Sequence, residues 1–187
     1  MLSERIPGTN IRYSGNADAF DIIRPMIEMT GGLTKSQLVK ITGISTYSIQ
    51  NWASRGYIPR AEKKKYLERH VARVLIINAM KDALNVEEIQ EIMGIVNGDT
   101  EDESDDIISD STLFDYFCRV IRRFDETTLS EENVIKAVDD VLKDIDNVKD
   151  KTILRYALKI MAYAYISGKC LEQINLNKKE LIRYKEV

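Results

Sequence analysis

The segment from Leu33 to Arg60, LTKSQLVKITGISTYSIQNWASRGYIPR, constrains the fold more than any other part of the chain. Thr34 can cap a helix in which Leu38 and Ile41 lie on one face. Gly43 can end this helix abruptly, because glycine adopts the positive φ that such an ending requires. The first half of the segment therefore predicts a short helix followed by a tight turn.

A second helix is predicted directly after the turn, over about residues 46–54. Ser45 is a favourable N-cap, and Ile49 and Trp52 lie one turn apart on the inward face. The outward face carries uncharged hydrogen-bonding side chains, and glutamine and asparagine can pair bidentately with the adenine edge in a DNA major groove. A polar face that is only solvated is the alternative. The residues predicted to contact bases are Tyr47, Ser48, Gln50 and Asn51.

A small wing is predicted between residues 56 and 66. Tyr57 and Ile58 can form a short strand, Pro59 ends it, and the lysine-rich run forms a tip before Tyr66 returns to the core. A flexible basic loop is the competing interpretation. Contacts to the DNA backbone add affinity and register but little sequence information. The residues predicted to make them are Thr34, Lys35, Ser54, Arg55, Arg60, Lys63, Lys64, Lys65 and Tyr66.

Basic residues are concentrated around this segment. The window from Thr34 to Lys81 contains ten basic and two acidic residues, a formal charge of +8. The rest of the chain contains 17 basic and 28 acidic residues, so the overall charge of -3 hides a basic part beside an acidic part. A solvated charged face is again the alternative, but a basic surface of this size favours salt-dependent phosphate contacts.

The order of these parts resembles the MerR superfamily of winged helix-turn-helix regulators. The resemblance is carried by the turn GYIP, by Tyr66 at the end of the wing, and by NVEEIQEIM, a helix that Asn85 can cap. It implies a winged helix-turn-helix with a very short β-wing that binds double-stranded DNA. It does not transfer an operator preference, since Gln50, Asn51 and Trp52 replace the arginine and paired aromatics of many such recognition helices.

A closer similarity is to a bacterial family of domains of unknown function that is related to this superfamily. Over about residues 26–98 the chain shows GGLT at 31–34, IQNWASRG at 49–56, KKY at 64–66 and ARVLIIN at 72–78, which match the pattern of that family. The similarity implies the fold and, by analogy, DNA binding, without a target.

We predict a mainly all-α fold in four parts. Residues 1–16 form a loose N-terminal segment and residues 17–98 a MerR-like winged helix-turn-helix domain. Residues 99–110, DTEDESDDIISD, form an acidic linker, and residues 111–187 form a C-terminal helical bundle for dimerisation or effector binding.

The bundle is predicted from three amphipathic segments. The first carries an apolar stripe over residues 113–124, and the second begins at a capping box of Thr128 and Glu131. The third runs from Asp150 to about Gly168 and is expected to end at that glycine.

Dimerisation is expected through a bundle face and the strongly apolar helix at residues 71–80, because the C-terminal half lacks a long uninterrupted heptad pattern. Tyr156, Tyr163 and Tyr165 are interpreted as core or interface residues, with a ligand pocket as the alternative.

No metal or cofactor is expected. The metal sensors of the MerR superfamily use clustered cysteines, whereas Cys118 and Cys170 are isolated and His70 is the only histidine. Each cysteine is expected to be a small buried hydrophobe. An enzyme is not expected either, since the chain has no glycine-rich phosphate loop and no Ser-His-Asp or Cys-His set.

The leading hypothesis is a cytoplasmic, sequence-specific transcriptional regulator without a membrane segment, because no apolar run reaches the length of a span and no secretory leader is found. It is expected to act as a homodimer whose recognition helices reach major grooves roughly 34 Å apart, with a small-molecule or protein effector. The alternatives are a non-enzymatic protein adaptor and an excisionase-like architectural DNA-binding protein.

Overall fold

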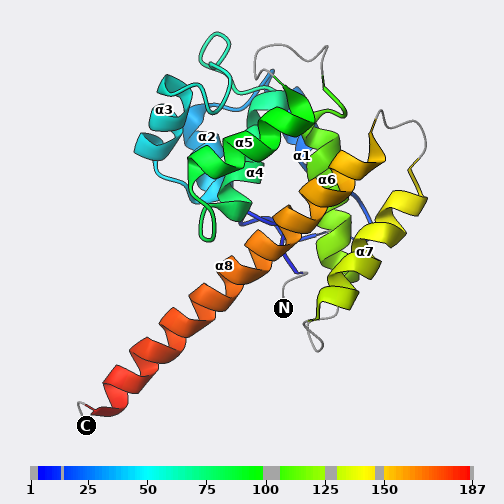
Figure 1. Cartoon of the computed structure of the whole chain (residues 1–187). Coiled ribbons are helices and arrows are strands. Elements are labelled where there is room, and N and C mark those ends of the chain that lie inside the picture. Colours follow the sequence, from blue (N-terminus) through cyan, green and yellow to red (C-terminus); the bar gives the residue numbers. More distant parts are fainter. Residues whose placement is uncertain (1–3, 14, 99–105, 125–129, 146–149, 186–187) are drawn as a thin grey trace.

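The computed structural model describes residues 4–13, 15–98, 106–124, 130–145 and 150–185. Within these ranges the fold is mainly helical, as predicted, and β pairing is limited to three isolated bridges. Figure 1 shows most helices gathered into one body, from which the last helix extends. The helices are α1 (Ala19–Glu28), α2 (Lys35–Thr42), α3 (Thr46–Ser54), α4 (Glu68–Met80), α5 (Val86–Asn97), α6 (Asp110–Arg123), α7 (Glu131–Lys143) and α8 (Lys151–Lys185).

The local signals for the ends of α2, α3 and α5 are confirmed. Thr34 caps α2 by accepting a hydrogen bond from a backbone N–H in its first turn at 3.3 Å, and Gly43 ends α2 with a φ of 72°. Ser45 caps α3 in the same way at 3.0 Å, and Asn85 caps α5 at 2.9 Å. These short-range interactions fix where α2, α3 and α5 begin and where α2 ends.

Helix α4 forms the centre of the core. Ten of its 13 residues are buried, and it packs against α2, α5, α6 and α8. A helix that is apolar around most of its circumference requires such cover on several sides. The expectation that residues 71–80 serve dimerisation is therefore wrong, because the rest of the chain already covers this helix.

Helix α6 packs into the same core as α4. It contacts α1, α4, α7 and α8, and the buried side chains of both predicted halves form one continuous cluster. Asp110, expected as the last residue of an acidic linker, is instead the first residue of α6, and it forms a buried ion pair with Arg73 of α4 at 2.6 Å. Residues 99–105 of the predicted linker lie outside the described residues. The predicted domain boundary thus does not separate two cores.

The N-terminal segment is packed where we expected it to be loose. Ile6 is fully buried, and its N–H donates to the carbonyl of Ile11 at 2.9 Å. Asn78 of α4 donates to the carbonyl of Gly8 at 2.7 Å. Gly8 has a φ of 69°, and a Cβ there would lie 3.0 Å from the carbonyl oxygen of Leu75, so glycine allows this turn to lie directly on α4.

Helix α7 begins at Glu131 with Ser130 as its N-cap, and the predicted cap Thr128 lies outside the described residues. Helix α8 does not end at Gly168, as predicted, but continues for 17 residues to Lys185. Glycine serves a close approach here, because a Cβ on Gly168 would lie 3.2 Å from Cβ of Asp82. Residues 169–185 extend away from the body (Figure 1).

The three tyrosines of α8 separate into two environments. Tyr165 is buried and meets Phe117 edge-to-face at 5.8 Å between ring centroids, as a core residue does. Tyr156 and Tyr163 lie on the outer side of the helix with exposed fractions of 60% and 37%.

Across the described ranges, none of the helices has both the length and the apolar character that crossing a membrane requires.

Candidate nucleic-acid interface

Helix α3 presents a polar outer face. Tyr47 has an exposed fraction of 77%, Gln50 is exposed, and Asn51 is half-buried. Within the described part of the chain, the side chains of Gln50 and Asn51 make no hydrogen bond to another residue. Ser48 is half-buried, and its hydroxyl lies 2.8 Å from that of Ser45. Of the four predicted base-contact residues, three therefore present side chains that are open to a partner.

The inner face of α3 is fixed by packing. Ile49 is fully buried and Trp52 has an exposed fraction of 6%. The carbonyl of Trp52 also accepts a hydrogen bond from the backbone N–H of Tyr57 at 2.8 Å, which turns the chain immediately after the helix. The polar face is thus held on a well-anchored helix, which is the condition for precise contacts to a rigid partner.

Residues 62–65, which we call the basic turn, form a tight hairpin. Glu62 and Lys65 exchange two backbone hydrogen bonds of 2.9 and 2.7 Å. Lys63 and Lys64 at the tip have φ of 49° and 67°, as the two central residues of a hairpin turn often do. The predicted strand at Tyr57 and Ile58 is wrong, since both residues lie in a bend and Ile58 is buried as a core residue.

A second bridge anchors the basic turn to the body. Leu33 and Tyr66 exchange backbone hydrogen bonds of 2.9 and 2.8 Å. The ammonium of Lys65 donates to the carbonyls of Thr30 and Gly32 at 2.9 and 3.1 Å. Lys65 therefore holds the loop after α1 and, unlike the two lysines before it, is not free to bind a phosphate.

Tyr66 differs from its predicted role as a backbone contact. Its exposed fraction is 4%, and its ring meets that of His70 edge-to-face at 6.0 Å between centroids. Burial raises the pKa of the Tyr66 hydroxyl. Tyr66 supports the base of the basic turn and does not present itself to a partner.

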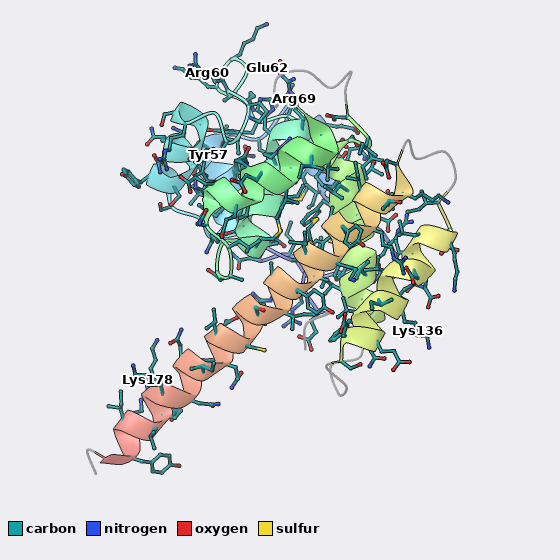
Figure 2. All side chains as sticks on the ribbon, in the orientation of Figure 1. Tyr57, Arg60, Glu62, Arg69, Lys136 and Lys178 are labelled. Atoms are coloured by element: carbon teal, nitrogen blue, oxygen red, sulfur yellow. The ribbon has the colours of Figure 1, made fainter. Side chains whose placement is uncertain are left out.

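The predicted cations differ in availability. Arg60, Lys63 and Lys64 are exposed and Lys35 is half-buried, and none of the four forms an ion pair within the described ranges. Figure 2 shows Arg60 and Glu62 on the loop that projects beyond α3 and α4. Thr34 and Ser54 are engaged locally, Thr34 as the cap of α2 and Ser54 by donating to the carbonyl of Asn51 at 2.9 Å.

Arg55 is tied to the start of α5. Its guanidinium forms an ion pair of 3.0 Å with Glu87 and lies 5.2 Å from the ring centroid of Tyr57. The Tyr57 hydroxyl donates to the same carboxylate at 2.7 Å. This hydrogen bond is the main cause of the lowered pKa of Glu87 and of the raised pKa of Tyr57. Sequence reasoning missed this contact, because it joins residues about 30 positions apart.

Both acidic side chains between Thr34 and Lys81 are paired. Glu62 accepts from Arg69 at 2.9 Å, and Glu68 accepts from Arg24 of α1 at 2.7 Å. The hydrogen bonds from Arg24 are the main cause of the lowered pKa of Glu68. Neither carboxylate lies unpaired beside the open lysines, so the surface around the basic turn is cationic.

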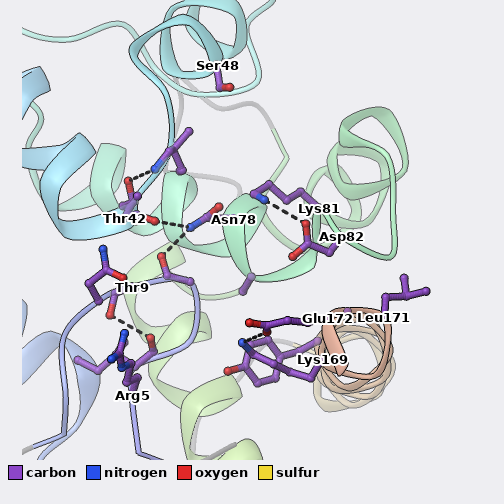
Figure 3. A pocket seen from close by; sticks show the side chains of 18 of the residues that line it. Arg5, Thr9, Thr42, Ser48, Asn78, Lys81, Asp82, Lys169, Leu171 and Glu172 are labelled. Atoms are coloured by element: carbon purple, nitrogen blue, oxygen red, sulfur yellow. Dashed lines mark hydrogen bonds and ion pairs between the residues drawn. The ribbon is translucent and has the colours of Figure 1, made fainter. Parts of the chain in front are cut away.

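A crevice of about 970 Å³ lies on the inner side of α3, between the N-terminal segment, the turn after α2 and the middle of α8 (Figure 3). Ser48 and Trp52 reach this crevice from α3. Its charged walls contain two ion pairs. These are Lys81 with Asp82 at 3.0 Å and Lys169 with Glu172 at 2.8 Å. Effector binding, which we expected of residues 111–187, stays a prediction.

The cysteines occupy unlike positions. Cys118 is buried, as expected, and burial raises its pKa, whereas Cys170 is exposed on α8, where the expectation of a buried residue is wrong. Among the described residues, no group of three or more His, Cys, Asp or Glu side chains is arranged to hold a metal ion.

Comparison with known families identifies one match. Residues 24–117 match the model of the domain of unknown function DUF1836. The chain belongs to this family. No curated protein and no solved structure matches the chain. The DUF1836 domain includes α2, α3, the basic turn, α4 and α5, and it continues through the acidic segment into α6, which agrees with the packing of α6 on α4.

Proposed function

We propose that this DUF1836 protein is a sequence-specific DNA-binding regulator. In this proposal it is a MerR-like winged helix-turn-helix with α3 in the major groove and the basic turn on the sugar-phosphate backbone. The observation that carries the proposal is the pairing of two surfaces. The unbonded amides of Gln50 and Asn51 lie on one anchored helix, and unpaired cations at Arg60, Lys63 and Lys64 follow directly after it.

The chemistry of each surface suits one part of a DNA duplex. Amide side chains without an internal partner can each form two hydrogen bonds with an adenine edge, which distinguishes base pairs in the major groove. Lysines at the tip of a tight turn can approach phosphates without a change of backbone shape. Lys35 lies at the margin of these surfaces and would add a backbone contact, whereas Arg55 holds α3 to α5 through Glu87.

The first test asks whether the α3 amides determine sequence preference. Duplexes that bind the full chain are selected from genomic fragments, and the variant Gln50→Ala/Asn51→Ala is then compared with the wild type on selected and scrambled duplexes. We expect the selected duplex to lose about 5- to 150-fold in affinity for each lost bidentate contact, with scrambled duplexes unchanged. The matched control is Gln173→Ala/Asn175→Ala, which removes the same two amides from the exposed part of α8. An equal loss on every duplex would contradict base contacts by α3.

The second test concerns the basic turn. Replacing two phosphate contacts by Lys63→Ala/Lys64→Ala should lower the salt slope of log K by about 2 and weaken binding to all duplexes about 30-fold at 0.15 M salt. The control Lys136→Ala/Lys151→Ala removes the same charge from exposed lysines of α7 and α8, and Figure 2 shows Lys136 far from the basic turn. An unchanged slope would show that the basic turn does not touch DNA.

The same selection distinguishes the other function classes. Retention of no duplex at low salt, together with a stable protein partner in co-purification, would replace the proposal by a protein adaptor. Binding without sequence preference, accompanied by DNA bending, would favour an architectural role. We propose the homodimer as part of the regulator, because a two-fold pair of α3 helices can bind two half-sites at once.

A further inference from the structure

The outer side of α8 carries a continuous stripe that the rest of the described chain leaves open. Its positions alternate by three and four residues over four consecutive heptads, which is the spacing of a two-helix coiled-coil contact, so the expectation that the C-terminal half lacks a long heptad pattern is wrong. All eight side chains are exposed. We call this stripe the outer seam. It consists of Ile160, Tyr163, Ser167, Cys170, Ile174, Asn177, Leu181 and Tyr184.

The first half of the outer seam forms the floor of an apolar groove. The groove has a volume of about 670 Å³, and its floor includes Ile160, Tyr163 and Cys170. The loop between α4 and α5 lines it with Leu84, and the start of α7 lines it with Glu131. A groove with an apolar floor between two raised walls suits an amphipathic helix.

The second half of the outer seam lies on the part of α8 that leaves the body. Figure 1 shows this part projecting from the body, with one side toward the crevice beside α3, and its 17 residues extend about 25 Å at the helical rise. Ile174, Leu181 and Tyr184 have exposed fractions of 59%, 71% and 84%. An isolated helix with such a row of large apolar side chains gains stability only when a partner covers that row.

We propose that a second copy of this chain covers the outer seam in an antiparallel arrangement. Each copy inserts residues 174–184 into the groove of its partner, so that one helix supplies both the groove and the segment that fills the other groove. In an antiparallel pair, the residue numbers of each contact layer have a constant sum. We choose the register in which this sum is 344. Each seam residue of the groove half, 160–170, then faces a seam residue of the partner's projecting half, 174–184.

This register matches the side chains by polarity. Ile160 meets Tyr184 of the partner subunit, and Tyr163 meets Leu181 of the partner subunit. The two polar positions, Ser167 and Asn177, meet each other across the same interface. Cys170 then packs against Ile174 of the partner subunit next to the two-fold axis. No layer places a polar side chain against a large apolar one.

Charge and area support the same occupant. The projecting segment carries Lys178, Lys179 and Arg183 beside the seam, and the wall of the groove carries the carboxylate of Glu131, so the pair brings opposite charges to the groove. From the exposed fractions of the five apolar seam residues and the neighbouring Leu171, complete cover removes about 700 Å² of side-chain surface per subunit, near the roughly 800 Å² of a standard interface. The register also places Ile160 and its copy in the partner subunit about 36 Å apart along the helices.

This inference rests on the proposed function only because it names the surface through which the proposed homodimer forms. Its test uses no DNA, so dimerisation and DNA binding can fail separately. The full chain is measured by analytical ultracentrifugation from 1 to 100 μM, and we expect a dimer. The variant Ile174→Asp/Leu181→Asp should weaken dimerisation at least 100-fold, with helical content retained because both residues are exposed.

The matched control is Leu176→Asp, which places an acid on the same projecting segment but on another face. Leu176 has an exposed fraction of 49%, similar to the 59% of Ile174, and it faces the crevice beside α3. The control should remain dimeric. A monomeric wild type at 100 μM, or equal dissociation of the seam variant and the control, would overturn the proposal.

Disulfide trapping tests the direction and register. In a Cys170→Ser background, the double variant Ser167→Cys/Asn177→Cys should form a covalent dimer on oxidation, because these two positions share a layer. Within one helix they lie about 15 Å apart and cannot bond to each other. Each single variant should stay uncrosslinked. Crosslinking by Ser167→Cys alone would indicate a parallel pair and overturn the antiparallel arrangement.

Discussion

The buried ion pair between Arg73 and Asp110 yields the sharpest stability prediction. The Nε of Arg73 lies 2.6 Å from Oδ2 of Asp110, and the two side chains have exposed fractions of 4% and 9%. Asn97 at the end of α5 donates to the other carboxylate oxygen. The network therefore joins α4, α5 and α6 at the point where the chain returns from the acidic segment.

We expect Asp110→Ala to lower the free energy of unfolding by about 3–5 kcal/mol, since it leaves the guanidinium of Arg73 buried without its partner. That is a large share of the roughly 5–15 kcal/mol of a typical domain. The double variant Arg73→Met/Asp110→Ala should lose less than Asp110→Ala alone, because no unpaired charge remains in the core. The exposed pair of Glu62 and Arg69 is the control, and Glu62→Ala should lower stability by less than about 1 kcal/mol.

These differences are measured by urea unfolding, which is monitored by circular dichroism and by the fluorescence of Trp52, the only tryptophan. Trp52 reports on α3, whereas circular dichroism reports on all helices, so the two transitions should coincide if both predicted halves share one core. A loss below about 1 kcal/mol for Asp110→Ala would refute the assigned role of the ion pair. Separate transitions in the wild type would refute the single cooperative core.

Further predictions concern single sites. Burial raises the pKa of Asp115 to about 6 from 3.8, although the hydrogen bond from the backbone N–H of Phe20 acts to lower it. The folded chain therefore binds this proton more tightly, and the stability from this group is complete below about pH 4 and lost as the pH rises through 6. Asp115→Asn should gain about 1–2 kcal/mol at pH 7 and nothing at pH 4 in thermal unfolding, and a gain independent of pH would contradict this. Gly32→Ala should destabilise by at least about 1 kcal/mol more than Gly31→Ala, because Gly32 has a φ of 102° and its Cβ would lie 2.9 Å from Cβ of Lys65, whereas a Cβ on Gly31 meets no described atom within 4 Å. Equal losses in urea would show that the contact with Lys65 does not matter.

The sequence predicts those parts of the structure whose physics is local. Thr34, Ser45 and Asn85 were identifiable as caps because each bonds to a backbone N–H three residues later, and Gly43 was identifiable as a helix end because it follows one apolar stripe and precedes another. The outward face of α3 followed from the spacing of its two inward residues. A period of 3.6 residues and the capping preferences are sufficient for such predictions.

The failures share a long-range cause. Gly168 has the local appearance of a helix end, but its role is to admit Asp82, a residue 86 positions earlier. Lys65 belongs to a run of three lysines, yet only its ammonium reaches the carbonyls after α1. Asp110 lies in a strongly acidic stretch, and its buried partner on α4 has no signal near it in sequence. Each assignment needed a contact that the pattern of neighbouring residues does not contain.

The same contacts explain how the proposed interface holds its shape. The C-terminal end of α3 is fixed to α5 through Arg55 and Glu87, while the basic turn is fixed to the loop after α1 through Lys65. Arg24 of α1 is in turn bonded to Glu68 at the start of α4, and α5 packs on α4 directly. The spacing between the amides of α3 and the lysines of the basic turn is therefore set by one helix, α4, rather than by the short chain that joins them. In the proposed complex with DNA, sequence preference depends on holding both sets of contacts at once, so loosening either tether should lower specificity before it lowers overall affinity.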